Sequence, residues 1–159
     1  MKSITYRGGL VTFRIPRHWV EEYEEDGGGT FYEDRPDSGT LRLNVLTFTG
    51  PAGSPAKSPL GVLQGSSKAS TGTMRALPNG NALLTGMDAA TDGSTPIHMY
   101  YWHIAQHLPP SHYRLALFTY TVEAGRATEL PIVQELAILN AELPLAGMAP
   151  VLGVLSDDQ

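Results

Sequence analysis

Short alternating runs of hydrophobic and polar residues occur along this chain, but its longest patterned stretch runs from Ile97 to Glu123 and is apolar or aromatic on both alternating sets of positions. Two runs rich in aromatic and β-branched residues flank a break at Pro109-Pro110-Ser111, a pattern that predicts a β-hairpin. If Leu108 to Ser111 form the loop, His107 faces His112 across the hairpin. Any binding surface is expected on this hairpin or beside it, because it holds most of the histidines and many of the aromatic residues.

The same pairing predicts which hairpin residues share a face, since side chains alternate along a strand. His103 then faces Ala116, and Tyr101 faces Phe118. One face carries Tyr100, Trp102, Ile104, Tyr113, Leu115 and Leu117, and the other carries Met99, Tyr101, His103, Phe118, Tyr120 and Val122. Neither face is plainly polar, so we expect both faces of the sheet to be at least partly covered.

Shorter runs of the same kind predict further strands. They are Ser3 to Tyr6, Leu10 to Ile15, Thr30 to Glu33, Thr40 to Thr49, Ser70 to Leu77 and Asn81 to Met87. The segment Trp19 to Glu25 is compatible with a short helix or a strand. We favour the strand, because the glycines Gly27 to Gly29 follow it as a turn. Asp88 to Pro96 is expected to be a polar loop.

Two helices are predicted. Ser58 and Pro59 have the chemistry of a helix start, with serine as the N-cap and proline in the first turn, so a short helix is expected from Pro59 to about Gln64. A second helix is expected from Thr128 to Leu143, where apolar residues recur at helical spacing. The residues 144–159 are expected to form a C-terminal tail.

Length and composition fit one folded domain spanning residues 1–159. The net charge is −5 and the basic residues are scattered, which argues against a nucleic-acid partner. The chain has no cysteine, so disulfides and thiolate chemistry are excluded. It shows no apolar signal core and no long apolar run, which predicts a soluble cytoplasmic protein without a membrane partner.

The candidate chemistry is sparse. His103 and His107 are four residues apart, which on a strand is roughly 13 Å and too far for one metal ion. Ser54 to Lys57 has the S-x-x-K spacing of penicillin-recognising enzymes, but the other two motifs of those enzymes are absent. We therefore predict no catalytic residue, no cofactor and no metal. The candidate interaction surface consists of Tyr101, His103, His107, His112 and Tyr120.

Residues 13–19 resemble the opening motif of PsbP-like and Mog1-like domains. The shared residues are Phe13, Pro16 and Trp19, in the pattern F-x-x-P-x-x-W. The order of the predicted elements is also similar to that superfamily. The resemblance implies an α+β fold: an α/β/α sandwich around a twisted antiparallel β-sheet, with a C-terminal helix packed on the sheet. It also implies that Trp19 is buried in the core.

The resemblance implies a non-catalytic domain that binds another protein, in a setting such as bacterial secretion or toxin immunity. Two other functions stay open. One is a small-ligand binding protein or enzyme that uses the aromatic and histidine surface of residues 97–122. The other is a structural subunit whose exposed apolar surface is covered in a homodimer.

Overall fold

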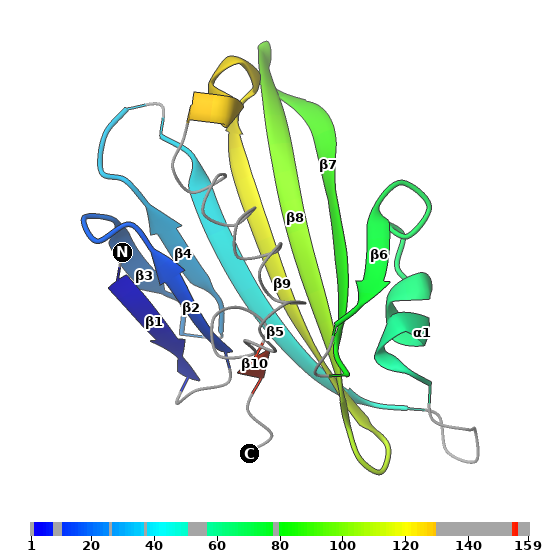
Figure 1. Cartoon of the computed structure of the whole chain (residues 1–159). Coiled ribbons are helices and arrows are strands. Elements are labelled where there is room, and N and C mark those ends of the chain that lie inside the picture. Colours follow the sequence, from blue (N-terminus) through cyan, green and yellow to red (C-terminus); the bar gives the residue numbers. More distant parts are fainter. Residues whose placement is uncertain are drawn as a thin grey trace.

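The computed structural model describes residues 2–7, 11–25, 27–36, 38–50, 57–77, 80–129 and 154–155. These residues form two antiparallel sheets (Figure 1). The larger has seven strands in the order β3-β4-β5-β9-β8-β7-β6. Its strands are β3 (Val20–Tyr23), β4 (Gly29–Tyr32), β5 (Thr40–Thr49), β6 (Thr73–Ala76), β7 (Ala82–Asp92), β8 (Thr95–Leu108) and β9 (His112–Glu123). The predicted sheet and the preference for a strand after Trp19 are thus confirmed.

The central hairpin of β8 and β9 forms as predicted, but its register differs by one residue. Leu108 pairs with His112 and His107 pairs with Tyr113, so the loop consists of Pro109 to Ser111 alone. The physical reason lies in Leu108. A residue that precedes proline favours extended backbone, so Leu108 continues the strand instead of entering the loop.

This shift corrects the predicted faces, because a slip of one residue moves a whole strand to the opposite face of a sheet. Trp102 pairs with Phe118 and Tyr100 pairs with Tyr120, so these residues share a face. Tyr101, His103, Leu115 and Leu117 lie on the other face. Buried clusters occupy both faces, which confirms that each is at least partly covered.

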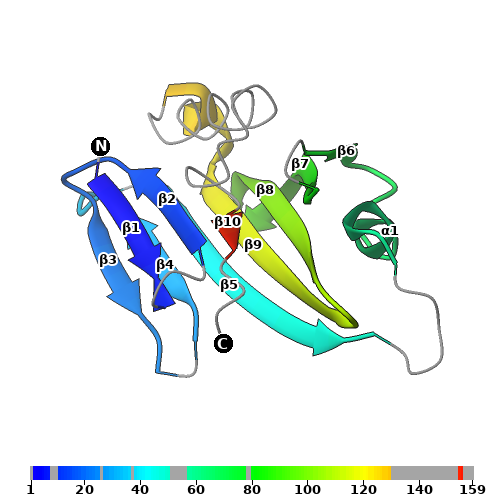
Figure 2. The ribbon, with the colours of Figure 1, turned by 60° about the horizontal axis from the view of Figure 1, so that its bottom comes forward.

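One face of the large sheet is covered by the small sheet, and we call it the sheet-covered face. The small sheet has the order β1-β2-β10 and consists of β1 (Lys2–Tyr6), β2 (Val11–Ile15) and β10 (Val154–Leu155). Figure 2 shows it stacked on the β3–β5 end of the large sheet. Phe13 of β2 packs edge-to-face on Phe31 and Phe118, with ring centroids 5.2 and 5.0 Å away.

The opposite face carries α1 (Pro59–Gln64), and we call it the helix face. The predicted start of α1 is confirmed: Ser58 is the N-cap, its hydroxyl accepts a hydrogen bond from the Gly61 N–H at 3.0 Å, and Pro59 opens the helix. Leu63 is buried against Leu84 and Tyr101 of the sheet. The helix packs at the β6–β8 end, and on this face no described element covers β5 (Figures 1 and 2).

The predicted loop from Asp88 to Pro96 is instead mostly strand: β7 runs to Asp92, and a tight turn at Gly93 (φ 62°) leads into β8. A Gly-Ser pair between two strands is typical of a two-residue hairpin in which the glycine has a positive φ, and Gly93-Ser94 was the sequence signal that was missed.

Only part of the predicted α/β/α sandwich is seen. The described residues form a mostly antiparallel sheet with one short α-helix. Most of the C-terminal helix predicted from Thr128 to Leu143 lies outside the described residues. Residues Ala124–Glu129 form a short 3-10 helix, η2, which includes Thr128. No helix among the described residues is long and apolar enough to cross a membrane.

Candidate functional site

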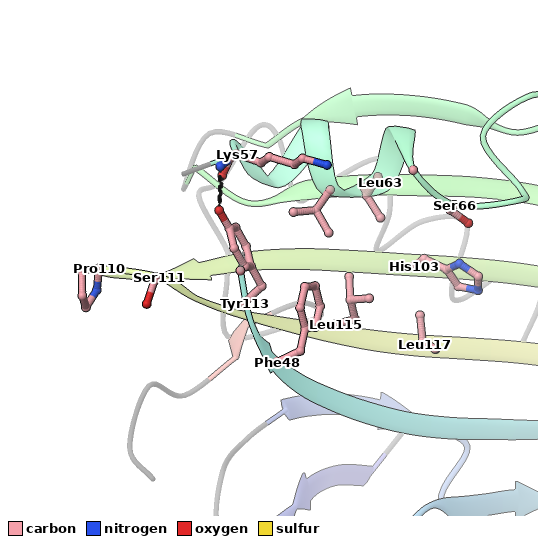
Figure 3. A pocket seen from close by; sticks show the side chains of 13 residues that line it. Phe48, Lys57, Leu63, Ser66, His103, Pro110, Ser111, Tyr113, Leu115 and Leu117 are labelled. Atoms are coloured by element: carbon pink, nitrogen blue, oxygen red, sulfur yellow. Dashed lines mark hydrogen bonds between the residues drawn. The ribbon is translucent and has the colours of Figure 1, made fainter. Parts of the chain in front are cut away.

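A groove on the helix face lies between α1 and the uncovered strands β5 and β9. Its volume is about 670 Å³, and most of its wall is apolar. Figure 3 shows Leu115 and Leu117 pointing from β9 into the space beside α1. The lining residues are Phe48, Gly50, Lys57, Val62, Leu63, Gly65, Ser66, His103, Pro110, Ser111, Tyr113, Leu115 and Leu117.

Three neighbouring aromatic rings lie at one end of the groove. The ring of Tyr113 lies 5.5 Å from that of Phe48 and 5.1 Å from that of His107, at interplanar angles of 24° and 31°. The strand register places them side by side, since Tyr113 pairs with Phe48 on one flank and His107 on the other. Gly50 lies against the Tyr113 ring, where an added Cβ would come within 3.1 Å of it.

Hydrogen bonds fix this end of the groove. The Tyr113 hydroxyl accepts a bond from the Lys57 N–H at 2.6 Å and donates to the Lys57 carbonyl at 3.0 Å. The Gly50 N–H donates to the Ser111 carbonyl at 2.8 Å. These bonds tie β9 to the segment that enters α1, so the two walls are held in place without a ligand.

At the other end, His103 is half-buried beside an ion pair. Burial lowers the pKa of the His103 imidazole, the nearby Lys68 ammonium lowers it further, and Asp88 partly offsets the effect. Lys68 pairs with Asp88 and lies 5.5 Å above the ring of Tyr101. His103 is therefore neutral near pH 7, and a neutral imidazole can both donate and accept a hydrogen bond.

The groove opens onto exposed apolar residues of β5. Leu46 is 51% exposed and Phe48 is 39% exposed, although both belong to a strand of the sheet. Leu46 pairs with Leu115, so it continues the apolar floor sideways. Exposed apolar residues that adjoin a groove are typical of an interaction surface.

The predicted interaction surface is only partly brought together. His103 lines the groove, and the His107 ring packs at a tilt against Tyr113 of its wall. Tyr101 lies on the same face but is buried beneath α1. Tyr120 lies on the sheet-covered face with no exposed area, and His112 is exposed at the hairpin end and is not among the residues that line the groove. The one-residue register error explains why Tyr120 was grouped with His103.

Sequence reasoning missed Phe48, Tyr113 and the residues of α1. One signal was available: Leu46 and Phe48 share a predicted face with the polar residues Arg42 and Asn44. Two large apolar side chains on an otherwise polar face indicate a surface patch. How α1 packs beside them could not be derived from spacing alone.

A second, smaller hollow of about 300 Å³ lies where β1 ends, lined by Thr5, Tyr6, Arg7, Tyr23, Glu24 and Gly28. Arg7 has a left-handed backbone (φ 44°), and its guanidinium lies 5.8 Å from the Tyr6 ring. The Tyr6 hydroxyl accepts a hydrogen bond from the Gly28 N–H at 2.8 Å. These contacts stabilise the turn after β3, so we assign the residues around the hollow a structural role.

The donors for a metal site are not gathered in the part of the chain that the structure describes. No group of three His, Asp or Glu side chains lies close enough to bind one ion there. His103 and His107 both lie on β8, four residues apart, as the strand prediction requires.

Comparison with known proteins identifies the fold. LpqN of Mycobacterium tuberculosis, described as involved in cell envelope biogenesis, superposes with a TM-score of 0.56 at 13% identity, over 90% of this chain and 86% of LpqN. LpqN has the Mog1p/PsbP-like fold. This chain has the Mog1p/PsbP-like fold. The prediction made from Phe13, Pro16 and Trp19 is thereby confirmed at the level of the fold.

Two other solved structures are similar to this Mog1p/PsbP-like chain. A protein of Bacteroides thetaiotaomicron VPI-5482 gives a TM-score of 0.55 at 15% identity over 78% of the chain, which spans 42% of that protein's length. The Ran-binding protein Mog1p of Saccharomyces cerevisiae gives 0.49 at 12% identity, over 91% of this chain and 92% of Mog1p. No family model matches the sequence, and no curated protein matches it.

Proposed function

We propose that this chain is a non-catalytic binding domain that takes up a protein partner on its helix face. The observation that carries the proposal is the apolar pair Leu46 and Phe48, exposed at the open side of a preformed groove. Exposed apolar side chains of this size are stabilised when a partner removes them from water, by roughly 25 cal/mol for each Å² buried.

The groove is suited to binding because its walls are fixed in advance. Tyr113 is held by Lys57 and by two neighbouring rings, so little side-chain freedom is lost when a partner arrives. The polar groups of the groove also favour binding over catalysis. The Tyr113 hydroxyl is committed to Lys57, and Ser66 Oγ accepts a bond from the Lys68 N–H at 3.2 Å.

LpqN is described as involved in cell envelope biogenesis. A bacterial process such as secretion or toxin immunity is the cellular setting that we propose for this chain, with the cytoplasm as its location. One fold supports many unrelated functions, so the function has to be argued from the surface of this chain. The exposed apolar residues of the helix face favour a protein partner in this setting.

A second candidate function is the binding of a small apolar ligand. The volume of the groove favours it, since pockets for drug-sized ligands typically measure about 300–1,000 Å³ and have apolar walls with a few polar groups. In this case His103 and Ser66 would orient the ligand at the end of the groove away from Tyr113.

Two exposed apolar residues on opposite faces of the sheet provide a matched test. Leu46 lies on the helix face, whereas Met87 pairs with Tyr100 on the sheet-covered face and is 44% exposed. A photo-crosslinking amino acid is placed at each position in turn and activated in the native host. We expect a discrete protein adduct from position 46 and none from position 87.

Other outcomes decide between the functions. Equal adducts from both positions, or no adduct from position 46, would contradict a partner on the helix face. A small molecule that copurifies with the wild type and is lost from Leu46→Glu, but not from Met87→Glu, would favour the second candidate function. An adduct between two copies of the chain would favour the homodimer.

A further inference from the structure

The second half of β5 has an edge that no described strand occupies. β9 pairs with β5 along its whole length, from Thr40 to Thr49. On the other side β4 pairs only with Thr40 to Leu43. From Asn44 to Thr49 no described strand pairs with the outer edge of β5, over roughly 20 Å. Gly28 lies beside the first of these residues, since an added Cβ there would come within 3.1 Å of the Asn44 side-chain oxygen. Figure 1 shows β4 ending long before β5 does.

The direction of the backbone groups on this edge follows from one hydrogen bond. The Gly50 N–H points toward β9, because it donates to the Ser111 carbonyl. Successive residues of a strand direct their backbone groups to opposite sides. The N–H and C=O groups of Val45, Thr47 and Thr49 therefore point outward, away from β9.

The sequence of this edge lacks the residues that protect strand edges in natural proteins. Such edges usually carry a lysine, a proline, a bulge or an inward-facing charge, which prevents pairing with another chain. The segment from Asn44 to Thr49 reads NVLTFT and contains no charge, proline or glycine. It presents the two exposed apolar side chains of the helix face, Leu46 and Phe48.

The geometry points to strand addition at β5: an extended segment of a partner protein pairs with the edge from Asn44 to Thr49. This inference rests on the proposed function, because it names how the protein partner is held. The partner's backbone bonds to Val45, Thr47 and Thr49, while its alternate apolar side chains pack beside Leu46 and Phe48. The partner segment is uncharged and apolar at every second position, to match this edge.

The length of the edge favours a partner segment over a second copy of the chain. A stable dimer normally buries about 800 Å² on each partner, far more than this short edge offers. A second copy that paired through its own β5 would also bring its β4 and Gly50 to the two ends of the edge from Asn44 to Thr49, where they would obstruct pairing. A loop or terminus of another protein enters it without that obstruction.

Proline substitution tests the backbone directly. Thr47→Pro removes an outward N–H and leaves the backbone ladder to β9 intact, because the backbone N–H and C=O of Thr47 point away from β9. Thr47→Val is the matched control. It keeps the N–H, and like the proline variant it removes the hydroxyl that accepts a bond from Arg114 Nε at 3.3 Å.

The probe is a peptide selected from a display library of random segments of about ten residues, screened against the full chain. We expect the selected peptide to bind wild type and Thr47→Val alike, and to bind Thr47→Pro about tenfold more weakly or worse. Its binding should slow amide exchange at Val45, Thr47 and Thr49. If Thr47→Pro does not fold, N-methylation of the peptide at successive residues replaces it, and affinity should fall at every second position only.

The remaining outcomes separate this inference from the proposed function. Equal affinity for wild type and Thr47→Pro, together with lost affinity for Leu46→Glu, would overturn strand addition and leave the groove as the site. Selected peptides whose affinity neither variant changes, or a screen that selects no peptide, would overturn both strand addition and the proposed function. Self-association that Thr47→Pro abolishes would assign the edge to a second copy and overturn the inference.

Discussion

Tyr113 holds Lys57 by both of its backbone polar groups, across 56 positions of sequence. The phenol accepts from the Lys57 N–H at 2.6 Å and donates to its carbonyl at 3.0 Å. This pair of bonds connects β9 to the start of α1 and so sets the distance between the groove's floor and its helical wall. Both stability and binding are expected to depend on it.

Tyr113→Phe should lower the free energy of unfolding by about 1–3 kcal/mol, because two hydrogen bonds are lost and each contributes about 0.5–1.5 kcal/mol. Tyr101→Phe is the matched control. Tyr101 is equally buried on the same face, but its hydroxyl has no hydrogen-bond partner among the described residues. Its removal should change stability by less than about 0.5 kcal/mol. Urea melts of the three proteins provide the comparison, and equal losses in the two variants would contradict the role of the Tyr113 bonds.

Trp19→Ala should be among the most destabilising substitutions. Trp19 is 4% exposed and stacks on Tyr120, with ring centroids 6.2 Å apart and an interplanar angle of 19°. Truncation of a buried tryptophan costs about 3–5 kcal/mol, against a total stability that is typically about 5–15 kcal/mol. Trp19→Phe keeps a ring against Tyr120 and should lose less. A loss below about 1 kcal/mol for the alanine variant would show that Trp19 is not a core anchor.

Much of the fold was predictable because local signals there agreed with tertiary packing. β5 has the predicted bounds, Thr40 to Thr49, since its alternation continues without interruption. α1 begins at the predicted cap, because Ser58 and Pro59 satisfy the first turn whatever the helix packs on. The F-x-x-P-x-x-W motif indicated the fold, and the burial of Trp19 agrees with it.

The candidate site was less predictable, because it depends on register and on helix placement. A loop shorter by one residue, with Leu108 kept in the strand, moved Tyr120 away from His103 and brought Tyr113 beside His107. The groove also needs α1 to pack beside β9 without covering β5. That arrangement arises from contacts distant in sequence, which periodicity does not encode.

Gly86→Ala should destabilise the helix-face core. Gly86 pairs with Tyr101, and an added Cβ would overlap the Tyr101 hydroxyl and ring. The buried ring has to shift, and such overpacking typically costs about 1–3 kcal/mol. Gly125→Ala is the control, because it lies in η2 with no atom within 4 Å of an added Cβ. Thermal melts should separate the two variants, and a neutral Gly86→Ala would mean that Tyr101 does not occupy this position in solution.

His103 should make the protein less stable in acid. Its pKa is lowered in the folded state, mainly by burial and also by Lys68, from the ordinary value of 6.5. The unfolded chain then binds more protons than the folded one between these two pKa values, so stability rises with pH across that window. The contribution is fully present above about pH 6.5 and is lost as the pH falls toward the folded pKa.

The substitution His103→Gln removes this titration while keeping a polar side chain that can donate and accept hydrogen bonds. Its free energy of unfolding should therefore fall less steeply than that of the wild type as the pH drops below about 6.5. His112→Gln is the control for the substitution itself, because His112 is exposed at the hairpin end. Imidazole signals followed by NMR through the same range should show the pKa of His103 below the ordinary value of 6.5. A His103 pKa at or above 6.5, or parallel curves for wild type and His103→Gln, would contradict the half-buried position of His103 beside Lys68.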